Sequence, residues 1–161
     1  MQKLQQTFEY EYYDDISQLN PADAALLQAA RAVTGQAYAP YSNFRVGVVM
    51  RLANGEQVSG TNQENASFPA GICAERTALS AATVLYPDVP IETMAISYNN
   101  LLGNSGDPIS PCGICRQSLA EYEQRLHHPI RLILSGQSGS VWIIPAAGQL
   151  LPLSFSASDM A

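Results

Sequence analysis

The chain has little cysteine, little charge and no long apolar run. Three cysteines among 161 residues cannot all pair internally, so we expect reduced thiols and a cytoplasmic protein. Lysine and arginine number 8 against 14 acidic residues, and the net charge of −6 argues against a nucleic-acid partner, which basic side chains would have to neutralise. No apolar stretch approaches the roughly 20 residues that cross a membrane, and residues 1–6 lack a signal-peptide layout, so we expect no membrane association.

The length and composition predict one folded domain. A chain of 161 residues is large enough for a hydrophobic core without disulfides. Only 14% of residues are charged and 47% are hydrophobic, which indicates apolar surface to spare for contact with other subunits. We expect residues 1–22 to form an N-terminal extension and residues 23–161 to form the single domain.

Hydrophobic periodicity and turn signals predict three helices and five strands. The helices are expected over residues 21–35, 73–86 and 111–125, and the strands over 45–52, 57–61, 93–98, 130–134 and 141–144. This order predicts an α/β fold with three α-β-α layers and a mixed five-stranded sheet. Phe8, Tyr10 and Tyr12 alternate with acidic residues, which suits a short edge strand or a docked arm.

All three cysteines lie in two short phrases, Cys73-Ala-Glu-Arg and Pro-Cys112-Gly-Ile-Cys115-Arg. Both phrases fall at predicted helix N-termini, where free N–H groups and the helix dipole favour the thiolates that a metal requires. Three thiolates form a zinc site that lacks one protein ligand, and an open position distinguishes catalytic from structural zinc. Glu75 then has a task in proton transfer, and the set indicates hydrolytic deamination of a nucleoside base.

Other interpretations of the cysteines remain open. Buried cysteines are often inert, and a lone CxxC pair serves in redox proteins or in zinc fingers. Redox use leaves Cys73 and Glu75 without a role, and His127 and His128 lack the spacing of zinc-finger ligands. Arg76 follows the first phrase directly and is expected to act as a donor to the thiolates, although it can also be a surface arginine.

Five phrases together resemble one family. They are residues 37–47 (AYAPYSNFRVG), 62–68 (NQENASF), 73–78 (CAERTA), 111–117 (PCGICRQ) and 150–155 (LLPLSF). In this order they are similar to the small, three-cysteine, homotetrameric type of cytidine deaminase, over about residues 24 to 155. The resemblance implies deamination of cytidine and deoxycytidine to uridine and deoxyuridine with release of ammonia, as part of pyrimidine salvage.

The resemblance also implies roles for residues around the base. Cys73, Cys112 and Cys115 would hold Zn²⁺, and Glu75 would pass a proton from water to ring N3 and later assist the departure of ammonia. The backbone around Ala74 would contact the pyrimidine carbonyl.

Phe44 would pack against the base, and Asn62 with Glu64 would hold the ribose 3′-hydroxyl of a free pyrimidine nucleoside. Phe155 would come from a neighbouring subunit of the homotetramer to cover the base. Taken without the family, Asn62 can be a turn residue, Glu64 a solvated acid, and each phenylalanine part of the core.

The chain departs from the family pattern in places. Residues 1–20 exceed it, and the loop over residues 99–110 is longer than usual and leads directly into Cys112. Phe68 stands where a tyrosine is frequent, at a position associated with subunit contacts. A deaminase of modified aminonucleosides and a zinc-stabilised binding module without turnover therefore remain the alternative functions.

Overall fold

A mixed sheet forms the middle layer of the structure, a computed structural model that describes residues 1–160. Its six strands are β1 (Glu11–Tyr13), β2 (Phe44–Leu52), β3 (Gln57–Thr61), β4 (Ile91–Asn100), β5 (Arg131–Ser135) and β6 (Val141–Ile144). They lie in the order β1-β6-β5-β4-β2-β3. Only β4 and β5 run parallel, and every other neighbouring pair is antiparallel.

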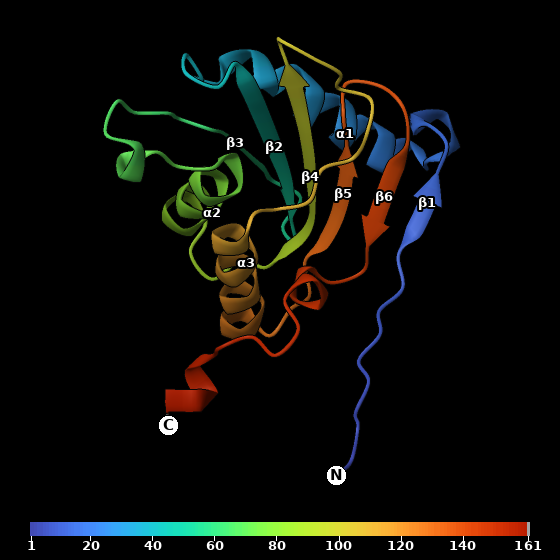
Figure 1. Ribbon diagram of the computed structural model, residues 1–161, viewed down its shortest axis with the longest axis vertical. Helices are drawn as coiled ribbons and strands as arrows, with labels where there is room; N and C mark the ends of the chain where they lie inside the picture. The colour runs from blue at the N-terminus through green and yellow to red at the C-terminus, as the bar shows by residue number, and fades with distance from the viewer. Residues whose placement is uncertain (161) are drawn as a thin grey trace.

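The prediction of five strands was wrong by one. The sixth strand is β1, which pairs antiparallel with β6 and forms the edge of the sheet (Figure 1). Aromatic packing accompanies this pairing, since the Tyr10 ring lies 5.5 Å from that of Trp142. The alternation of aromatic and acidic residues did indicate an edge strand here, but nothing in the local sequence shows which strand it joins.

Helices cover both faces of the sheet. α1 (Pro21–Val33) packs on one face, while α2 (Ala74–Leu85) and α3 (Gly113–Leu126) pack on the other (Figure 1). The three-layer α/β prediction is therefore confirmed. Short 3₁₀ turns complete the chain at Ile16–Gln18, Thr34–Gln36, Phe68–Ala70, Ala147–Leu150 and Ala157–Met160. Within residues 1–160, no helix is long and apolar enough to cross a membrane.

The sheet has a hydrophobic core on each side, because successive side chains of a strand point to opposite faces. In β2, Val48 and Met50 belong to the core under α2 and α3, and Val49 belongs to the core under α1. A side-chain carbon at Gly47 would lie 2.5 Å from the Ala30 carbonyl oxygen of α1. The missing side chain therefore lets α1 approach the sheet closely.

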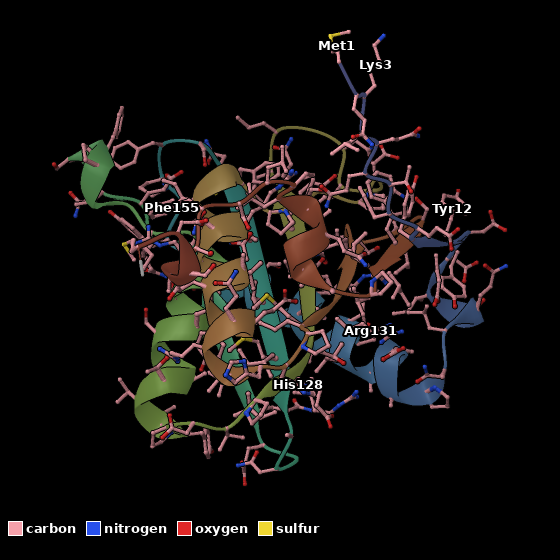
Figure 2. All side chains as sticks on the ribbon, turned by 90° about the horizontal axis from the view of Figure 1, so that it is seen from below. Met1, Lys3, Tyr12, His128, Arg131 and Phe155 are labelled. Atoms are coloured by element: carbon pink, nitrogen blue, oxygen red, sulfur yellow. The ribbon has the colours of Figure 1, made fainter. Side chains whose placement is uncertain are left out.

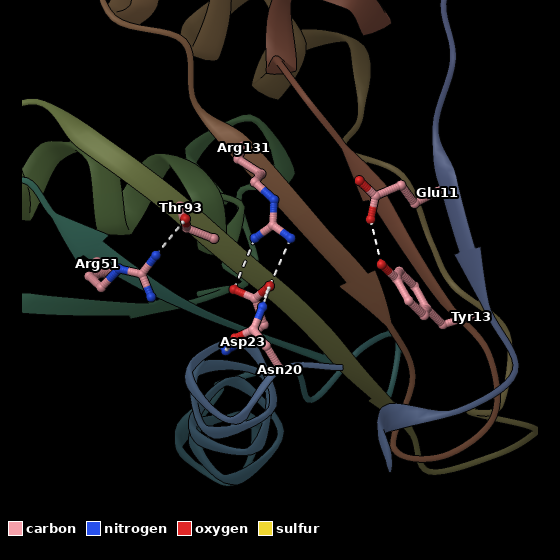
Figure 3. Close-up of polar contacts among 7 residues, drawn as sticks. All are labelled: Glu11, Tyr13, Asn20, Asp23, Arg51, Thr93 and Arg131. Carbon is pink, nitrogen blue, oxygen red and sulfur yellow. Dashed lines mark hydrogen bonds and ion pairs between the residues drawn. The ribbon is translucent and has the colours of Figure 1, made fainter. Parts of the chain in front are cut away.

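A buried ion pair fixes the start of α1 against the sheet (Figure 3). Asn20 caps the helix by accepting a hydrogen bond from the Asp23 N–H at 3.0 Å. Asp23 is 2% exposed, and Arg131 of β5 donates to both of its carboxylate oxygens at 2.7 and 2.9 Å. Burial alone would raise the pKa of Asp23, but the hydrogen bonds and charge of Arg131 outweigh it, so the pKa lies below its ordinary value.

We expect Asp23→Asn to lower the free energy of unfolding at pH 7 by about 2–3 kcal/mol, because Arg131 loses its partner. A carboxyl whose pKa is lowered by folding stabilises fully above its unfolded pKa of about 3.9 and loses that effect as pH falls through the lower folded value. The difference between the two proteins should therefore shrink below pH 4. Urea unfolding at several pH values measures this, with exposed Asp88→Asn as the control. An equal loss at pH 7 in both variants would contradict the assignment.

Candidate active site

The N-termini of α2 and α3 meet and bring the three cysteines together. Cys73 and Cys112 are the N-cap residues of these helices, and Cys115 lies in the first turn of α3. The Sγ atoms of Cys73 and Cys112 are 3.7 Å apart, those of Cys112 and Cys115 are 3.3 Å apart, and all three lie within 4.8 Å. Sulfurs about 2.3 Å from a tetrahedral zinc lie about 3.8 Å from one another. The residues present therefore fit a zinc ion.

Close backbone packing sets the position of Cys73. Gly60 of β3 faces the first turns of α2, where a side-chain carbon would lie 2.6 Å from the Ala74 carbonyl oxygen and 2.5 Å from the Ala78 nitrogen. Only glycine allows this approach. The segment before the cysteine is also fixed, since Gln63 and Ile72 exchange two backbone hydrogen bonds of 3.0 Å.

Arg116 performs a similar task for the second phrase, and the sequence patterns gave it no role of its own. Its Nε donates to the Pro111 carbonyl at 2.8 Å, and its Nη1 donates to the Leu150 carbonyl at 3.0 Å. The guanidinium thus joins the residue before Cys112 to the C-terminal segment. The only feature of the sequence that could have predicted this role is the position of Arg116 directly after Cys115.

The thiols affect one another's protonation. Hydrogen bonds from Cys115 and Cys112, together with the positive charge of Arg76, outweigh burial and lower the pKa of Cys73 to about 6. The hydrogen bond that Cys115 makes with Cys73, followed by burial, raises the pKa of Cys115. Binding of a metal removes the shared protons, because each sulfur coordinates as a thiolate.

A cavity of about 180 Å³ opens beside the sulfurs. It is lined by Val46, Asn62, Cys73, Ala74, Glu75, Ile109, Ser110 and Cys112. Glu75 follows Ala74 in the first turn of α2 and is 6% exposed. Burial raises the pKa of this carboxyl above its ordinary value. The cavity therefore combines a metal-binding face with a carboxyl that can take up and release a proton.

The structure brings some of the predicted substrate residues to this cavity. Ala74 and Asn62 line it. Phe44 instead stacks on Tyr98, with ring centroids 4.8 Å apart and planes inclined by 13°. The side chain of Phe155, labelled in Figure 2, lies on the C-terminal segment. It is 61% exposed and is not among the residues that line the cavity of its own chain.

Glu64 lines a second hollow, of about 400 Å³, together with Tyr41, Ser42, Asn65, Phe68 and Gly71. Its Oε2 accepts hydrogen bonds from the Tyr41 and Ser42 backbone N–H groups at 2.8 and 3.3 Å. The structure therefore spreads the predicted substrate residues over two hollows and a stacked ring. Their roles stay predictions.

Arg76 lines a different hollow, between α2 and α3. Within residues 1–160 it makes no hydrogen bond to a cysteine sulfur, and its effect on Cys73 is through charge. The expected donor role of Arg76 stays a prediction.

The two histidines do not complete the site. His127 ends α3 and His128 follows it, whereas Cys112 begins the same helix. A helix of 14 residues is about 21 Å long, so neither imidazole can reach the sulfurs from the far end. Neither histidine is therefore available as a fourth ligand, and Cys73 and Cys112 line the cavity instead.

Known proteins share this sequence and fold. The family described as "Cytidine and deoxycytidylate deaminase zinc-binding region" matches residues 21–127. The cytidine deaminase of Halalkalibacterium halodurans is 35% identical over 84% of this chain and 95% of its own length. The chain belongs to the cytidine deaminase family. A second relative, the cytidine deaminase of Sporosarcina psychrophila, is 31% identical over 84% of this chain and 93% of its own length.

Solved structures agree with the family assignment. The crystal structure of the cytidine deaminase from Burkholderia pseudomallei is 38% identical, with a TM-score of 0.70, over 81% of this chain and 97% of that one. The structure from Mycobacterium leprae is 32% identical, with a TM-score of 0.63, over 83% of this chain and 98% of that one. The match to a zinc-binding family and the cluster of three cysteines together identify zinc as the cofactor of this protein.

We expect Cys115→Ser to lose stoichiometric zinc, because a neutral hydroxyl replaces a buried thiolate at a site that has only three protein ligands. Zinc per chain, measured by atomic emission after dialysis, should fall from one to near zero. Ser118→Ala, one turn further along α3, is the matched control and should keep its zinc. Full zinc retention by the cysteine variant would contradict the three-sulfur site.

Proposed function

We propose that this protein hydrolyses free cytidine and deoxycytidine to uridine and deoxyuridine with release of ammonia, a reaction of pyrimidine salvage. The observation that carries the proposal is the meeting of buried Glu75 with Cys73 and Cys112 in one cavity of about 180 Å³. When bound, zinc supplies a Lewis acid that makes water nucleophilic near neutral pH. The acidic chain, with eight basic residues, favours an uncharged nucleoside over nucleic acid.

Glu75 moves the protons of this reaction. Its carboxylate takes a proton from the attacking water and gives it to ring N3. It then takes the second proton from the new hydroxyl on C4 and passes it to the amino group, which leaves as ammonia while the C4 carbonyl forms. One water is consumed, and its oxygen stays on C4. Because negative charge develops on N3 during attack, a carboxyl poised to donate there stabilises the transition state more than the substrate.

The start of α2 contributes to binding of the base. Ala74 is the first residue of the helix, so its N–H has no partner within the helix and can donate to the pyrimidine carbonyl. Phe44 packs against the base in this proposal. Its stacking on Tyr98 supports that role, because it holds the ring in a defined orientation.

Asn62 and Glu64 hold the sugar. Asn62 uses one acceptor site for the Val46 N–H at 2.7 Å and one donor for the Phe44 carbonyl at 2.9 Å, which leaves it one further site of each kind. Glu64 bonds backbone N–H groups through Oε2 and, within residues 1–160, makes no hydrogen bond through Oε1. Hydrogen bonds from Ser42, then Tyr41, lower its pKa. A charged Glu64 accepts a bond from the 3′-hydroxyl and repels a phosphate there.

The active assembly in this proposal is a cytoplasmic homotetramer in which Phe155 of one subunit covers the base bound by another. Several large apolar side chains are exposed and would be buried by such contacts: Phe68, Val84, Ile114, Leu153 and Phe155. Phe155 has no place in the cavity of its own chain, which supports a function in a neighbouring one.

Glu75→Gln should lower kcat for cytidine by about 10²- to 10⁴-fold, because the amide cannot carry the proton. Zinc content should stay at one per chain, since the substitution leaves the three sulfurs intact. The loss of the cytidine ultraviolet spectrum measures the rate, and Glu9→Gln in the exposed N-terminal segment is the control. Equal rates in the parent and in Glu75→Gln would contradict the proposal.

The same assay separates the alternative functions. A parent protein that holds zinc but leaves cytidine unchanged would redirect the search to modified aminonucleosides. Ile109 and Ser110, in the loop after β4, line the cavity and give that second candidate its physical basis. A zinc-stabilised binding module would turn over neither substrate class.

Phe155→Ala should raise KM for cytidine about five-fold or more, because stacking of a base on an aromatic ring contributes about 1–3 kcal/mol. Zinc content should not change. Steady-state kinetics and light scattering measure the effect, with Phe8→Ala as a control at another exposed phenylalanine. A fully active monomer would refute the shared site.

A further inference from the structure

The loop between β4 and α3 forms one wall of the cavity. It follows Asn100, the last residue of β4, and Ile109 and Ser110 near its end line the cavity just before Cys112. In Figure 1 this loop crosses from the end of β4 to the start of α3. The position of the loop therefore sets how much room a base has opposite Glu75.

The turn between β5 and β6, residues 136–139, holds the base of this loop by direct backbone contact. A methyl group on Gly136 would overlap the Ser105 carbonyl oxygen, and one on Gly139 would overlap the Gly106 carbonyl oxygen. Gly139 also has a φ of +74°, which favours glycine. The Gln137 N–H donates to the same Ser105 carbonyl at 2.7 Å. The two segments interlock in a way that larger residues would prevent.

The same turn holds the other side of the cavity. Gln137 Nε2 donates to the Tyr98 carbonyl at 3.2 Å, and Ser97 Oγ donates to the Gly136 carbonyl at 3.1 Å. The Tyr98 ring stacks on Phe44, two residues before Val46, which lines the cavity. One turn is therefore bonded to the elements on both sides of the base site.

Arg31 of α1 holds the turn from the face of the sheet that α1 covers, opposite the face under α2 and α3. Its Nε donates to the Gly136 carbonyl at 2.9 Å, and its Nη2 donates to Ser135 Oγ at 3.2 Å. Ser135 Oγ in turn donates to the Ser140 carbonyl at 2.9 Å, across the ends of β5 and β6. Contacts from α1, β4 and the loop after β4 therefore fix the turn, and the turn in turn fixes the position of that loop.

From these contacts we infer that residues 136–139 are a positioning element for the substrate, which sets the separation between the cavity wall at Ile109 and the wall at Val46. The inference rests on the proposed deaminase function. The turn does not line the cavity and contributes neither Glu75 nor a cysteine. Disturbing it therefore changes how the nucleoside is held rather than how protons move, and this raises KM while leaving kcat nearly constant.

The test uses two variants of the turn on the full chain. Gly136→Ala displaces the loop, and Gln137→Ala removes the bond to Tyr98 without adding bulk. We expect KM for cytidine to rise about ten-fold and about three-fold respectively, with kcat within about two-fold of the parent. The control is Gly35→Ala, where an added carbon meets no atom within 4 Å, and its KM should not change. Zinc content should stay at one per chain in all three.

Uridine binding by calorimetry gives a second readout that needs no turnover. A weaker affinity in both turn variants supports the inference, and an affinity equal to that of the parent overturns it. A fall in kcat with unchanged KM also overturns it, because loss of folded enzyme produces that pattern. If Gly136→Ala fails to fold, the result for Gln137→Ala alone decides.

Two outcomes separate the inference from the proposed function. A parent protein that neither binds uridine nor turns over cytidine overturns both. An active parent whose turn variants keep the parental KM overturns only the inference.

Discussion

The convergence of two helix N-termini on three sulfurs is the constraint on which the rest of the structure depends. Cys73 and Cys112 each begin a helix, so the metal site exists only if both helices start at the same place. Gly60 permits one approach, and Arg116 ties down the other. The same helix start places the Glu75 carboxyl near the sulfurs, because Glu75 lies in the first turn of the helix that Cys73 caps. The chemistry is thus a consequence of packing helices on the sheet.

Much of this could be predicted from local sequence. The start of the helix expected over residues 21–35 follows from the Asn20 cap and proline at the first position, although the α-helix ends at Val33 and continues as a 3₁₀ turn. The cysteine phrases predict the metal, because their residue types and spacing suffice. The sixth strand was missed, since pairing of β1 with β6 joins residues about 130 positions apart. The strand expected over 93–98 extends to Ile91–Asn100 because β2 pairs with it throughout, and this shortens the following loop.

Tertiary contacts account for what the sequence could not reveal about the site. The interlock of Gly136 with Ser105 depends on a turn and a loop that carry no recognisable motif. Phe155 has a predicted role in the site although it lies outside the cavity of its own chain, so that role depends on the proposed homotetramer. The two sides of the cavity differ in kind: helix ends build the metal side, and a loop held against the sheet forms the wall at Ile109 and Ser110.

The most direct test of the central claim is the coordination of zinc in the purified protein, measured by X-ray absorption at the zinc edge. We expect three sulfurs at about 2.3 Å and one water oxygen at about 2.0 Å, with that oxygen replaced or shifted when a nucleoside occupies the cavity. Four sulfurs, or an imidazole as the fourth ligand, would contradict it, because either closes the position that the reaction requires.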